Sequence, residues 1–591
     1  MQINSTTLVG KGYRTIKLNR YKRRVNIITG IGCGALLSCY LIQQYYYTPS
    51  LPFGDDLPVI FQFLFRFDEA PTWSEKIAIL VNNRFAEHRL LSASCITLLT
   101  YLISGTVQLP VLTVIAGLCW VSSTLLYFKW LKKSALSTIW LIPILFVFLA
   151  AAPYQVIYWP MAALQHLVVV FLCFITLYFL SAEEKTSPRL ILWAISFAFI
   201  TTFSAGNGMA VWPAGLLVLG LRRDVKYSLI WFFCSVLSVT LYLWDLPRTG
   251  LPSDQAAKLL LTNALRKIIG FFAGLGSAIH TKSYESFLDD ANYVFSLKYP
   301  SIYLGLLIVL LFGWAFRKTI LNYDSRISPV LGCTVFIFIS FAFIIWGRTP
   351  IDGEIVAFKS RYYPYSIVAI CNAIFLMAFL TKATFWYKWL FTGSVICGAT
   401  FWSIWQVVAY HKIYNHANLL QAGLFNWQHN GSWVVYQQTS YYENYFNAFF
   451  DEMKARHFPI QIPNTPLSQA FKNKKWTDHY FSELKQVQIQ KINNYVHLNL
   501  RNEQAQAIRN VDEGYTMVMA SERDTFLLWS VVSPTGIRNF FKTGQSCREG
   551  YRVEVALDQE KMPKGNYSLH QFYYSGNQGI INRKSESTIV F

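Results

Sequence analysis

Charged residues are scarce in this chain of 591 residues. Asp, Glu, Lys and Arg make up only 14% of it, whereas hydrophobic residues make up 53% and aromatic residues 17%. A soluble domain carries roughly 25% charged residues, so this composition excludes an ordinary soluble protein. The apolar residues gather in blocks close to the ~20 residues that a helix needs to cross a bilayer. These blocks stop near residue 410, where the composition becomes that of a soluble domain.

Acidic residues are scarcer than basic ones, which gives a formal net charge of +20. A charge of this size is typical of nucleic-acid binding or of cytoplasmic loops that face anionic lipid. Because the chain has so many apolar blocks, we favour the second interpretation. We therefore expect a lipid bilayer as a partner and no nucleic acid.

Several common chemical motifs are also missing. Of the ten cysteines only Cys547 lies in the soluble tail, where a single cysteine cannot form an internal disulfide. The chain has no Cys/His pattern of a zinc site, no phosphate-cradling Gly-Lys-Ser/Thr loop and no convincing Ser-His-Asp arrangement. The two halves of the apolar region do not visibly repeat each other, which weakens a transporter interpretation.

The basic residues predict how the chain crosses the membrane. The segment Lys11–Arg24 precedes the first apolar block, so the N-terminus is expected in the cytoplasm. Residues 90–106 either span the membrane or lie along its surface. We prefer the surface, because Lys129, Lys132 and Lys133 then fall inside. About eleven spans are expected, near residues 26–46, 109–128, 136–152, 163–181, 189–204, 208–221, 225–243, 299–317, 328–346, 364–381 and 387–408.

The fold class that follows is a polytopic α-helical membrane protein with a C-terminal α+β or β-rich domain. An odd number of spans places that domain outside, which is the periplasm in a bacterium with two membranes. Residues 255–280 remain open between an outside helix and a re-entrant one. The expected organisation is a basic N-terminus over 1–25, a membrane domain over 26–409 with a first outside loop at 47–108, and a C-terminal domain over 410–591.

The tail begins with a helical pattern, which runs from Tyr410 to Trp427 and again from Tyr441 to Arg456. After Lys485 the pattern changes to short alternating runs punctuated by Gly, Asn and Pro, which predict strands. These runs are Val487–Ile489, Val496–Leu498, Tyr515–Met519, Phe526–Val532 and Arg552–Val555.

The first outside loop opens with a pair of carboxylates, Asp55 and Asp56, directly after Gly54. Two adjacent carboxylates repel, so one of them holds its proton more strongly and is suited to act as a general base or a metal ligand. The alternative is that the pair caps a helix N-terminus, where Asp is favoured. The loop ends in Glu87-His88-Arg89, which either binds an anionic group or forms a local Glu–Arg pair at the interface.

A cationic cluster follows the ninth expected span, with Arg348, then Lys359, Arg361 and Tyr362. Arginine forms bidentate bonds with phosphate oxygens and tyrosine suits the membrane boundary. Outside loops usually carry few Lys and Arg residues. Because this loop has several, we favour a lipid-phosphate site over simple anchoring at the membrane surface. Two further outside loops carry candidate sugar contacts, namely Trp159 in one and Asn207 and Trp212 in the other; a tight glycine turn alone also explains the second loop.

These strings resemble those of a known superfamily. A cytoplasmic N-terminus, a long first outside loop that opens with an acidic pair, surface helices and many further spans resemble the GT-C membrane glycosyltransferases. Gly54-Asp55-Asp56, Glu87-His88-Arg89, Ser204–Pro213 and Ser360-Arg361-Tyr362 are similar to strings of uncharacterised bacterial GT-C-type proteins and of the O-antigen-modifying (Gtr-type) glucosyltransferases. The resemblance covers residues 1–410, and no family is identified for the tail.

The resemblance implies an inverting glycosyltransferase of the bacterial inner membrane. Its donor would be a sugar on undecaprenyl phosphate and its acceptor a periplasmic glycan such as O-antigen. Asp55 or Asp56 would be the base, with a slight preference for Asp55. Arg361, Arg348, Lys359, His88 and Arg89 would bind the departing phosphate, and Glu87, Tyr362, Trp159, Trp212 and Asn207 would contact the sugars.

The single acidic pair favours a metal-independent type with no cofactor, although a divalent metal is not excluded. A separate donor synthase and a flippase are possible partners. The alternatives are a flippase or exporter of lipid-linked glycans, and a polysaccharide polymerase or ligase. A flippase needs charged groups spread along its spans, whereas here the spans are almost free of charge.

Overall fold

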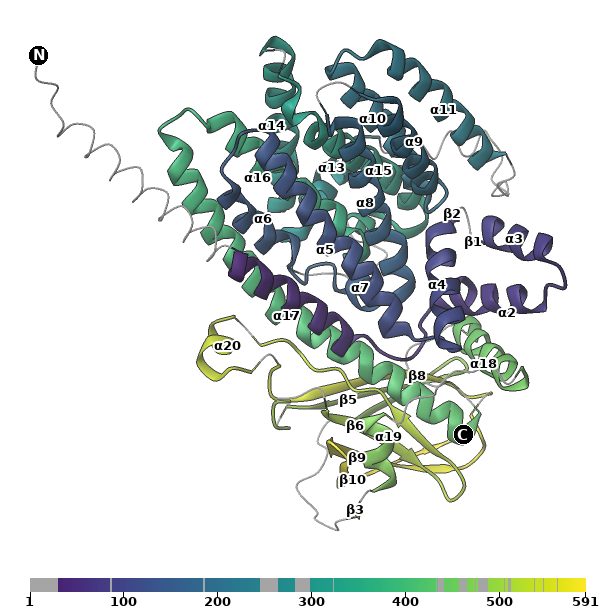
Figure 1. Ribbon diagram of the computed structural model, residues 1–591. Helices are drawn as coiled ribbons and strands as arrows, with labels where there is room; N and C mark the ends of the chain where they lie inside the picture. The colour runs from purple at the N-terminus through teal and green to yellow at the C-terminus, as the bar shows by residue number, and fades with distance from the viewer. Residues whose placement is uncertain are drawn as a thin grey trace, which may run out of the picture. The chain divides into compact units, whose positions relative to one another are not determined.

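The computed structural model divides the chain into two compact units (Figure 1). The membrane unit comprises Met1–Tyr46, Phe63–Ile96 and Val111–Ser403, and the terminal unit comprises Tyr47–Gln62, Thr97–Pro110 and Ile404–Phe591. The first outside loop expected at 47–108 is therefore shared between the units. The structure describes residues 30–85, 88–183, 186–244, 264–281, 298–322, 324–431, 433, 440–456, 465–473, 475–476, 487–503, 505–508, 512–535, 537–545, 547–560 and 562–591.

The membrane unit is helical, as expected for a chain whose backbone groups must bond to one another where water is absent. A first helix covers residues 30–47. The short strands β1 (Arg84–Phe85) and β2 (His88–Arg89) form a hairpin. The other elements are α2 (Gln62–Glu69), α3 (Trp73–Asn82), α4 (Leu91–Ser104), α5 (Leu109–Lys133), η2 (Thr138–Trp140), α6 (Leu141–Phe148), α7 (Tyr154–Tyr158), α8 (Pro160–Ser181), α9 (Pro188–Thr202), η3 (Gly206–Ala210), α10 (Val211–Leu221), α11 (Val225–Leu243), α13 (Ala264–Leu275), η4 (Ser277–Ile279), α14 (Pro300–Asn322), η5 (Ser325–Ile327), α15 (Ser328–Asp352), η6 (Glu354–Phe358), η7 (Ser360–Tyr362), α16 (Tyr363–Thr381) and α17 (Trp386–Asn430).

Seven of the described helices are long and apolar enough to cross a membrane, fewer than the eleven spans expected. The spans expected near 136–152, 189–204 and 208–221 correspond to shorter apolar helices, and the one expected at 26–46 begins outside the described residues. The helix over Thr138–Phe148, for example, rises only about 16 Å, short of the ~30 Å hydrocarbon core. The seven long helices are Leu109–Lys133, Pro160–Ser181, Val225–Leu243, Pro300–Asn322, Ser325–Thr349, Ser360–Thr381 and Trp386–Asn430.

The surface of this unit fits a lipid environment. Large apolar side chains such as Phe233 and Leu310 are more than 60% exposed, and contiguous apolar surface of this kind is rare on soluble monomers. The chain thus has the helices of a multi-pass membrane protein. Of the ambiguous segment 255–280, residues up to 263 lie outside the described part, and α13 occupies most of the rest.

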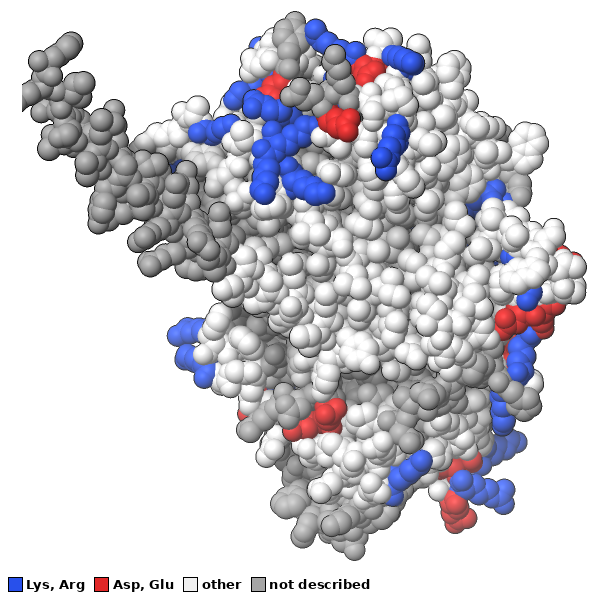
Figure 2. Space-filling model, viewed as in Figure 1, with Lys and Arg blue, Asp and Glu red and all other residues white. Residues whose placement is uncertain are grey.

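Basic side chains gather at one end of the membrane unit, which we call the basic end (Figure 2). There they donate hydrogen bonds to backbone carbonyls at helix C-termini, where cations offset the negative end of the helix dipole. The contacts are Lys133 to Ser181 O, Lys382 to Ser134 O at 3.5 Å, Lys318 to Leu380 O at 3.5 Å and Arg222 to Glu183 O at 2.6 Å. α8 and α16 both end at the basic end. Their first residues, Pro160 and Tyr363, therefore lie at the opposite end of the unit.

The terminal unit contains a β-sandwich, so the predicted β-rich tail is confirmed in outline. Its five-stranded sheet has the order β3-β10-β9-β6-β7, and its three-stranded sheet has the order β4-β5-β8. Among the described strands, β3 alone pairs in parallel, with β10. The elements are η1 (Leu57–Phe61), α18 (Ser440–Ala455), α19 (Pro466–Lys472), β3 (Lys475–Trp476), β4 (Val487–Ile492), β5 (Tyr495–Asn502), β6 (Glu513–Ala520), β7 (Thr525–Leu528), α20 (Ile537–Thr543), β8 (Tyr551–Asp558), β9 (Asn566–Ser575) and β10 (Gln578–Val590).

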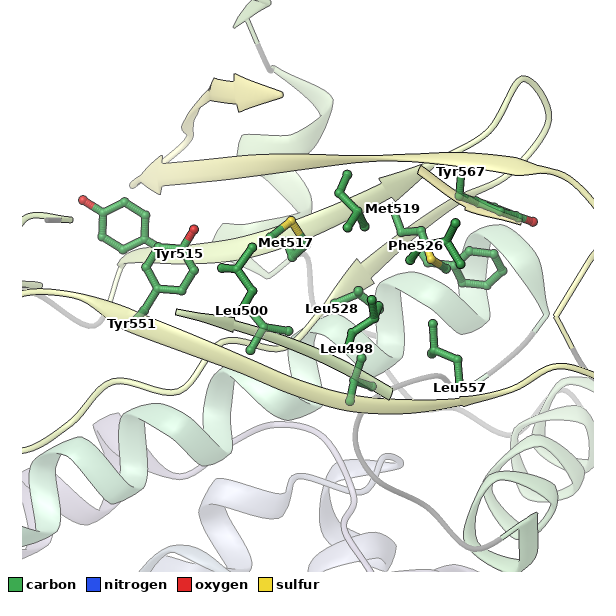
Figure 3. Close-up of a cluster of buried hydrophobic side chains, with 14 of the residues drawn as sticks. Leu498, Leu500, Tyr515, Met517, Met519, Phe526, Leu528, Tyr551, Leu557 and Tyr567 are labelled. Carbon is green, nitrogen blue, oxygen red and sulfur yellow. The ribbon is translucent and has the colours of Figure 1, made fainter. Parts of the chain in front are cut away.

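Alternating side chains of both sheets form the core of the sandwich. Leu498 and Leu500 of β5 face Met517 and Met519 of β6 between the sheets (Figure 3). The other face of the five-stranded sheet packs against α19 and against the part of α17 that follows Ile404 and belongs to this unit. There Phe471 contacts Phe572 with ring centroids 5.4 Å apart.

Asparagines of α17 pair with the edge of this sheet. Asn426 donates to the carbonyl of Leu527 at 2.9 Å and accepts from its N–H at 2.7 Å. Asn415 makes the same two bonds with Val532, and Asn430 donates to Thr525 O at 2.8 Å. An edge strand exposes a row of unpaired backbone groups. Here the amides of one helix take the place of a neighbouring strand.

Candidate functional site

The polar side chains of the membrane unit that sequence analysis singled out lie mainly at the end opposite the basic end. Four segments bring them there: the β1–β2 hairpin, η3, the C-terminal part of α15 and η7. In the sequence His88 and Arg348 are 260 positions apart, yet Nη2 of Arg348 lies 3.2 Å from Nε2 of His88. Arg361, Arg348 and His88 all lie close enough to His166 of α8 to interact with it electrostatically. Because a guanidinium only donates, Nε2 of His88 accepts from Arg348. We call Arg348 and Arg361, together with this His88 ring, the cation cluster, whose positive charge comes from the two arginines.

Hydrogen bonds to Gln155 hold the backbone segment that carries Arg361 in place. Its N–H donates to Oε1 of Gln155 at 3.2 Å, and the N–H of Gln155 donates to Oγ of Ser360 at 3.2 Å. The guanidinium carbon lies 5.2 Å from the ring centroid of Tyr362, within the range of a cation–π interaction. The Tyr362 ring in turn meets the ring of His166 edge-on at 5.9 Å.

The glycine turn at η3 lets the backbone approach this cluster. The N–H of Gly206 lies 3.4 Å from Nδ1 of His88, and a Cβ on Gly206 would itself lie 3.1 Å from that nitrogen. At Gly208 a Cβ would overlap the carbonyl oxygen of Thr201. The glycines thus serve close packing at the turn, which is one of the two roles that the sequence left open.

Asn207 joins the turn to the helices behind it. Its amide donates to Oγ of Ser340 at 3.1 Å and to the hydroxyl of Tyr365 at 2.9 Å. That hydroxyl lies 2.9 Å from Nδ1 of His166. Asn207 was expected to contact sugar, and it is half-buried in this network. A chain of hydrogen bonds therefore runs from η3 through α16 to α8, next to the cation cluster.

Two of the expected site residues have structural roles instead. Arg89 is 4% exposed and donates to the carbonyls of Tyr242 and Leu241, both at 3.3 Å. These carbonyls belong to the last turn of α11, so Arg89 caps that helix and we omit it from the phosphate set. Trp212 is 1% exposed and donates from Nε1 to Oγ1 of Thr202 at 2.8 Å. The expectation that Trp212 stacks on a sugar is wrong, because its indole is enclosed by protein.

The remaining expected residues are placed as follows. Glu87 lies outside the described residues. Lys359 and Trp159 are half-buried, and Trp159 directly precedes α8. Tyr362 is buried beside Arg361. Within the described part of the chain, no group of three or more His, Cys, Asp or Glu side chains is arranged to hold a metal ion.

The acidic pair lies in the terminal unit, in a tight turn before η1. Gly54 has a φ of 49°, a conformation that glycine adopts at little cost. Oδ2 of Asp56 accepts from the N–H of Phe53 at 3.0 Å. Asp56 is fully buried, whereas Asp55 is half-buried. Asp56 stands at the N-cap position of η1 but makes no side-chain bond to the helix, so its carboxylate closes the turn instead.

Aromatic contacts within the terminal unit hold this turn. The ring of Phe53 meets His416 of α17 edge-on at 4.6 Å, and Phe61 meets Phe449 of α18 at 5.4 Å. The turn that carries Asp55 is thus fixed on both sides. Asp55 is the more accessible of the two carboxylates.

Sequence reasoning noted Tyr365 only as one of the tyrosines that follow Arg361, and it placed Gln155 and His166 at an outside surface without a specific role. One signal was available for His166, since ionisable side chains within a membrane helix are rare and usually functional. Its partners are not readable from spacing, because Tyr365 lies 199 positions further along the chain. Comparison of the sequence with known protein families finds no matching family model, and comparison with curated proteins finds no match.

Proposed function

We propose that the protein is an inverting glycosyltransferase that moves a sugar from a polyprenyl-phosphate-linked donor to a glycan acceptor. The single observation that carries the proposal is the cation cluster, in which His88, Arg348 and Arg361 converge at one end of the helical unit. Guanidinium groups bind phosphate oxygens by charge-assisted hydrogen bonds. In such a transfer the sugar–phosphate bond breaks and the departing phosphate gains charge, which positioned cations stabilise.

Topology supports the choice of membrane face. The basic end is expected in the cytoplasm by the positive-inside rule, so the opposite end with the cation cluster is expected outside. In a bacterial inner membrane the outside is the periplasm, where O-antigen and other surface polysaccharides are accessible. The donor's lipid chain would remain in the bilayer beside the helices.

The proposed base is Asp55. A base must accept a proton from the acceptor hydroxyl as that oxygen attacks the anomeric carbon. Asp56 is fully buried and its Oδ2 is engaged by the backbone of Phe53, which leaves the half-buried Asp55 as the better candidate. The proposal needs no metal for this step, and a divalent ion is a testable addition.

The test is mass analysis of the surface glycan in the native host. Asp55→Asn, Arg348→Ala and Arg361→Ala are each expected to remove one hexose-sized increment from the glycan, because losing such a group slows transfer by about 10²–10³-fold. Asp56→Asn is expected to act through folding and lower the amount of protein in the membrane. Lys388→Ala, which alters a basic residue in the first turn of α17, is the matched control and should leave the glycan unchanged.

Two other outcomes would redirect the assignment. An unchanged glycan in all variants, with loss only on deletion of the whole chain, would contradict the transfer chemistry and favour a flippase or exporter. Shortened chains of normal repeat composition would favour a polymerase or ligase. Equal membrane levels of every variant must be shown first.

A further inference from the structure

His166 lies in an unusual position for an ionisable residue. It is in the second turn of α8 and only 8% exposed. Its Nδ1 lies 2.9 Å from the hydroxyl of Tyr365. Within the described part of the chain, Nε2 has no hydrogen-bond partner. Since His166 keeps a small exposed surface and Nε2 is its unbonded polar atom, Nε2 is a candidate for contact with a ligand.

The hydrogen-bond chain determines what Nε2 can do. The amide of Asn207 donates to the oxygen of Tyr365. Among the described residues, Nδ1 of His166 is the only acceptor bonded to the Tyr365 hydroxyl, so we assign the hydroxyl proton to that bond. Nδ1 of His166 then accepts that proton's hydrogen bond. A neutral imidazole has one acceptor and one donor nitrogen, and Nε2 is therefore the N–H donor.

The surroundings indicate which kind of ligand this donor meets. The ionisable groups that interact electrostatically with His166 are Arg361, Arg348 and His88. The ring of Tyr362 contacts both the His166 ring and the Arg361 guanidinium. A neutral donor beside two guanidinium groups suits an anion with several acceptor oxygens, such as a phosphate monoester or diester.

We infer that His166 binds the phosphate of the donor through Nε2–H, and that Tyr365 and Asn207 are positioning residues that hold its tautomer. The inference rests on the proposed function, since it assumes that the cation cluster binds phosphate. It adds an uncharged donor to that site. An uncharged donor can direct one phosphate oxygen without adding to the positive charge of the cluster.

The experiment measures binding rather than turnover. The full chain in nanodiscs is titrated with farnesyl phosphate, and with farnesol as the ligand without phosphate. Hydrogen bonds to charged groups predict that His166→Ala weakens farnesyl phosphate about 10- to 100-fold and leaves farnesol unchanged. His166→Gln, whose Nε2–H replaces the ring donor, should remain within about threefold of the wild type. His166→Asn lacks that reach and should resemble His166→Ala.

Tyr365→Phe tests the positioning role. Without the hydroxyl the imidazole can adopt either tautomer, so binding of farnesyl phosphate should fall roughly tenfold. Tyr127→Phe is the matched control, because Tyr127 is equally buried in the same unit and its hydroxyl donates to Asn372 at 2.7 Å. The control should lose similar stability and no affinity for phosphate.

The outcomes separate the two proposals. If Arg348→Ala weakens farnesyl phosphate while His166→Ala binds it like the wild type, the phosphate site stands and the role of His166 is overturned. If neither variant changes binding, both proposals fail. If His166→Gln is as weak as His166→Ala, the assignment of Nε2 as the donor is wrong.

Discussion

Cys547 shows how burial lowers the reactivity of a single thiol. It is 1% exposed beside Pro534, and burial raises the pKa of its thiol to about 12. Since the thiolate is the reactive form, the thiol is protonated and inert at neutral pH. We expect no alkylation by iodoacetamide at pH 8 in the native chain and full alkylation after unfolding, as read by peptide mass spectrometry. Rapid labelling of the native chain would contradict this burial.

Gly208 shows how much the glycine turn of the candidate site depends on close packing. A Cβ there would overlap the carbonyl of Thr201, and overpacking of this kind costs about 1–3 kcal/mol. Gly208→Ala should therefore lower the melting temperature of the purified chain in detergent. Gly220→Ala is the control, because nothing lies within 4 Å of a Cβ at that position, and it should be neutral or slightly stabilising. Equal melting temperatures would contradict the overlap.

The asparagines of α17 form the element whose contribution is most easily tested. Asn426→Ala leaves the N–H and the carbonyl of Leu527 without their partner, at about 1–3 kcal/mol each. Asn430→Ala removes only one bond, to Thr525 O, and should cost less. The measurement is thermal unfolding of the full chain, with proteolysis of residues 487–591 as a second readout. Equal losses in the two variants would mean that the edge pairing is not what stabilises the sheet.

Sequence patterns predicted the elements well where one face of an element is apolar and the other is not. β5 and β8 alternate and were predicted. β9 was missed because side chains on both its faces are buried, Leu569 toward one core and Phe572 toward the other, so its sequence does not alternate. The pattern also divided α17 into a span that ends near residue 408 and a separate helical stretch over Tyr410–Trp427, whereas the structure has one continuous helix to Asn430. The apolar run ends where His411 and Lys412 follow, but the helix continues as its C-terminal part packs on the sheet.

At the scale of the whole molecule, charge patterning was the most informative part of the sequence. It separated the basic end from the opposite end, and hydrogen bonds at the helix termini agree with that division. The number of spans was overestimated, because apolar composition does not reveal where a helix such as α6 ends. Arg348 and Arg361 were selected from residue type and from the loop expected there, and the structure brings both near His166, with Arg348 on α15. The Asn207–Tyr365–His166 chain was not predicted, since it depends on which helices become neighbours.

The pairing of α17 with β7 also has a consequence for the order of synthesis. Asn426 precedes Leu527 by 101 positions, so the helix leaves the ribosome well before the strand that it covers. When β7 emerges, its open side can meet the asparagines of its own chain before it meets β7 of another nascent copy. The helix is thus available to cover the edge of β7 as soon as that strand is made. This lowers the risk that the β7 edges of two nascent chains pair with each other and aggregate.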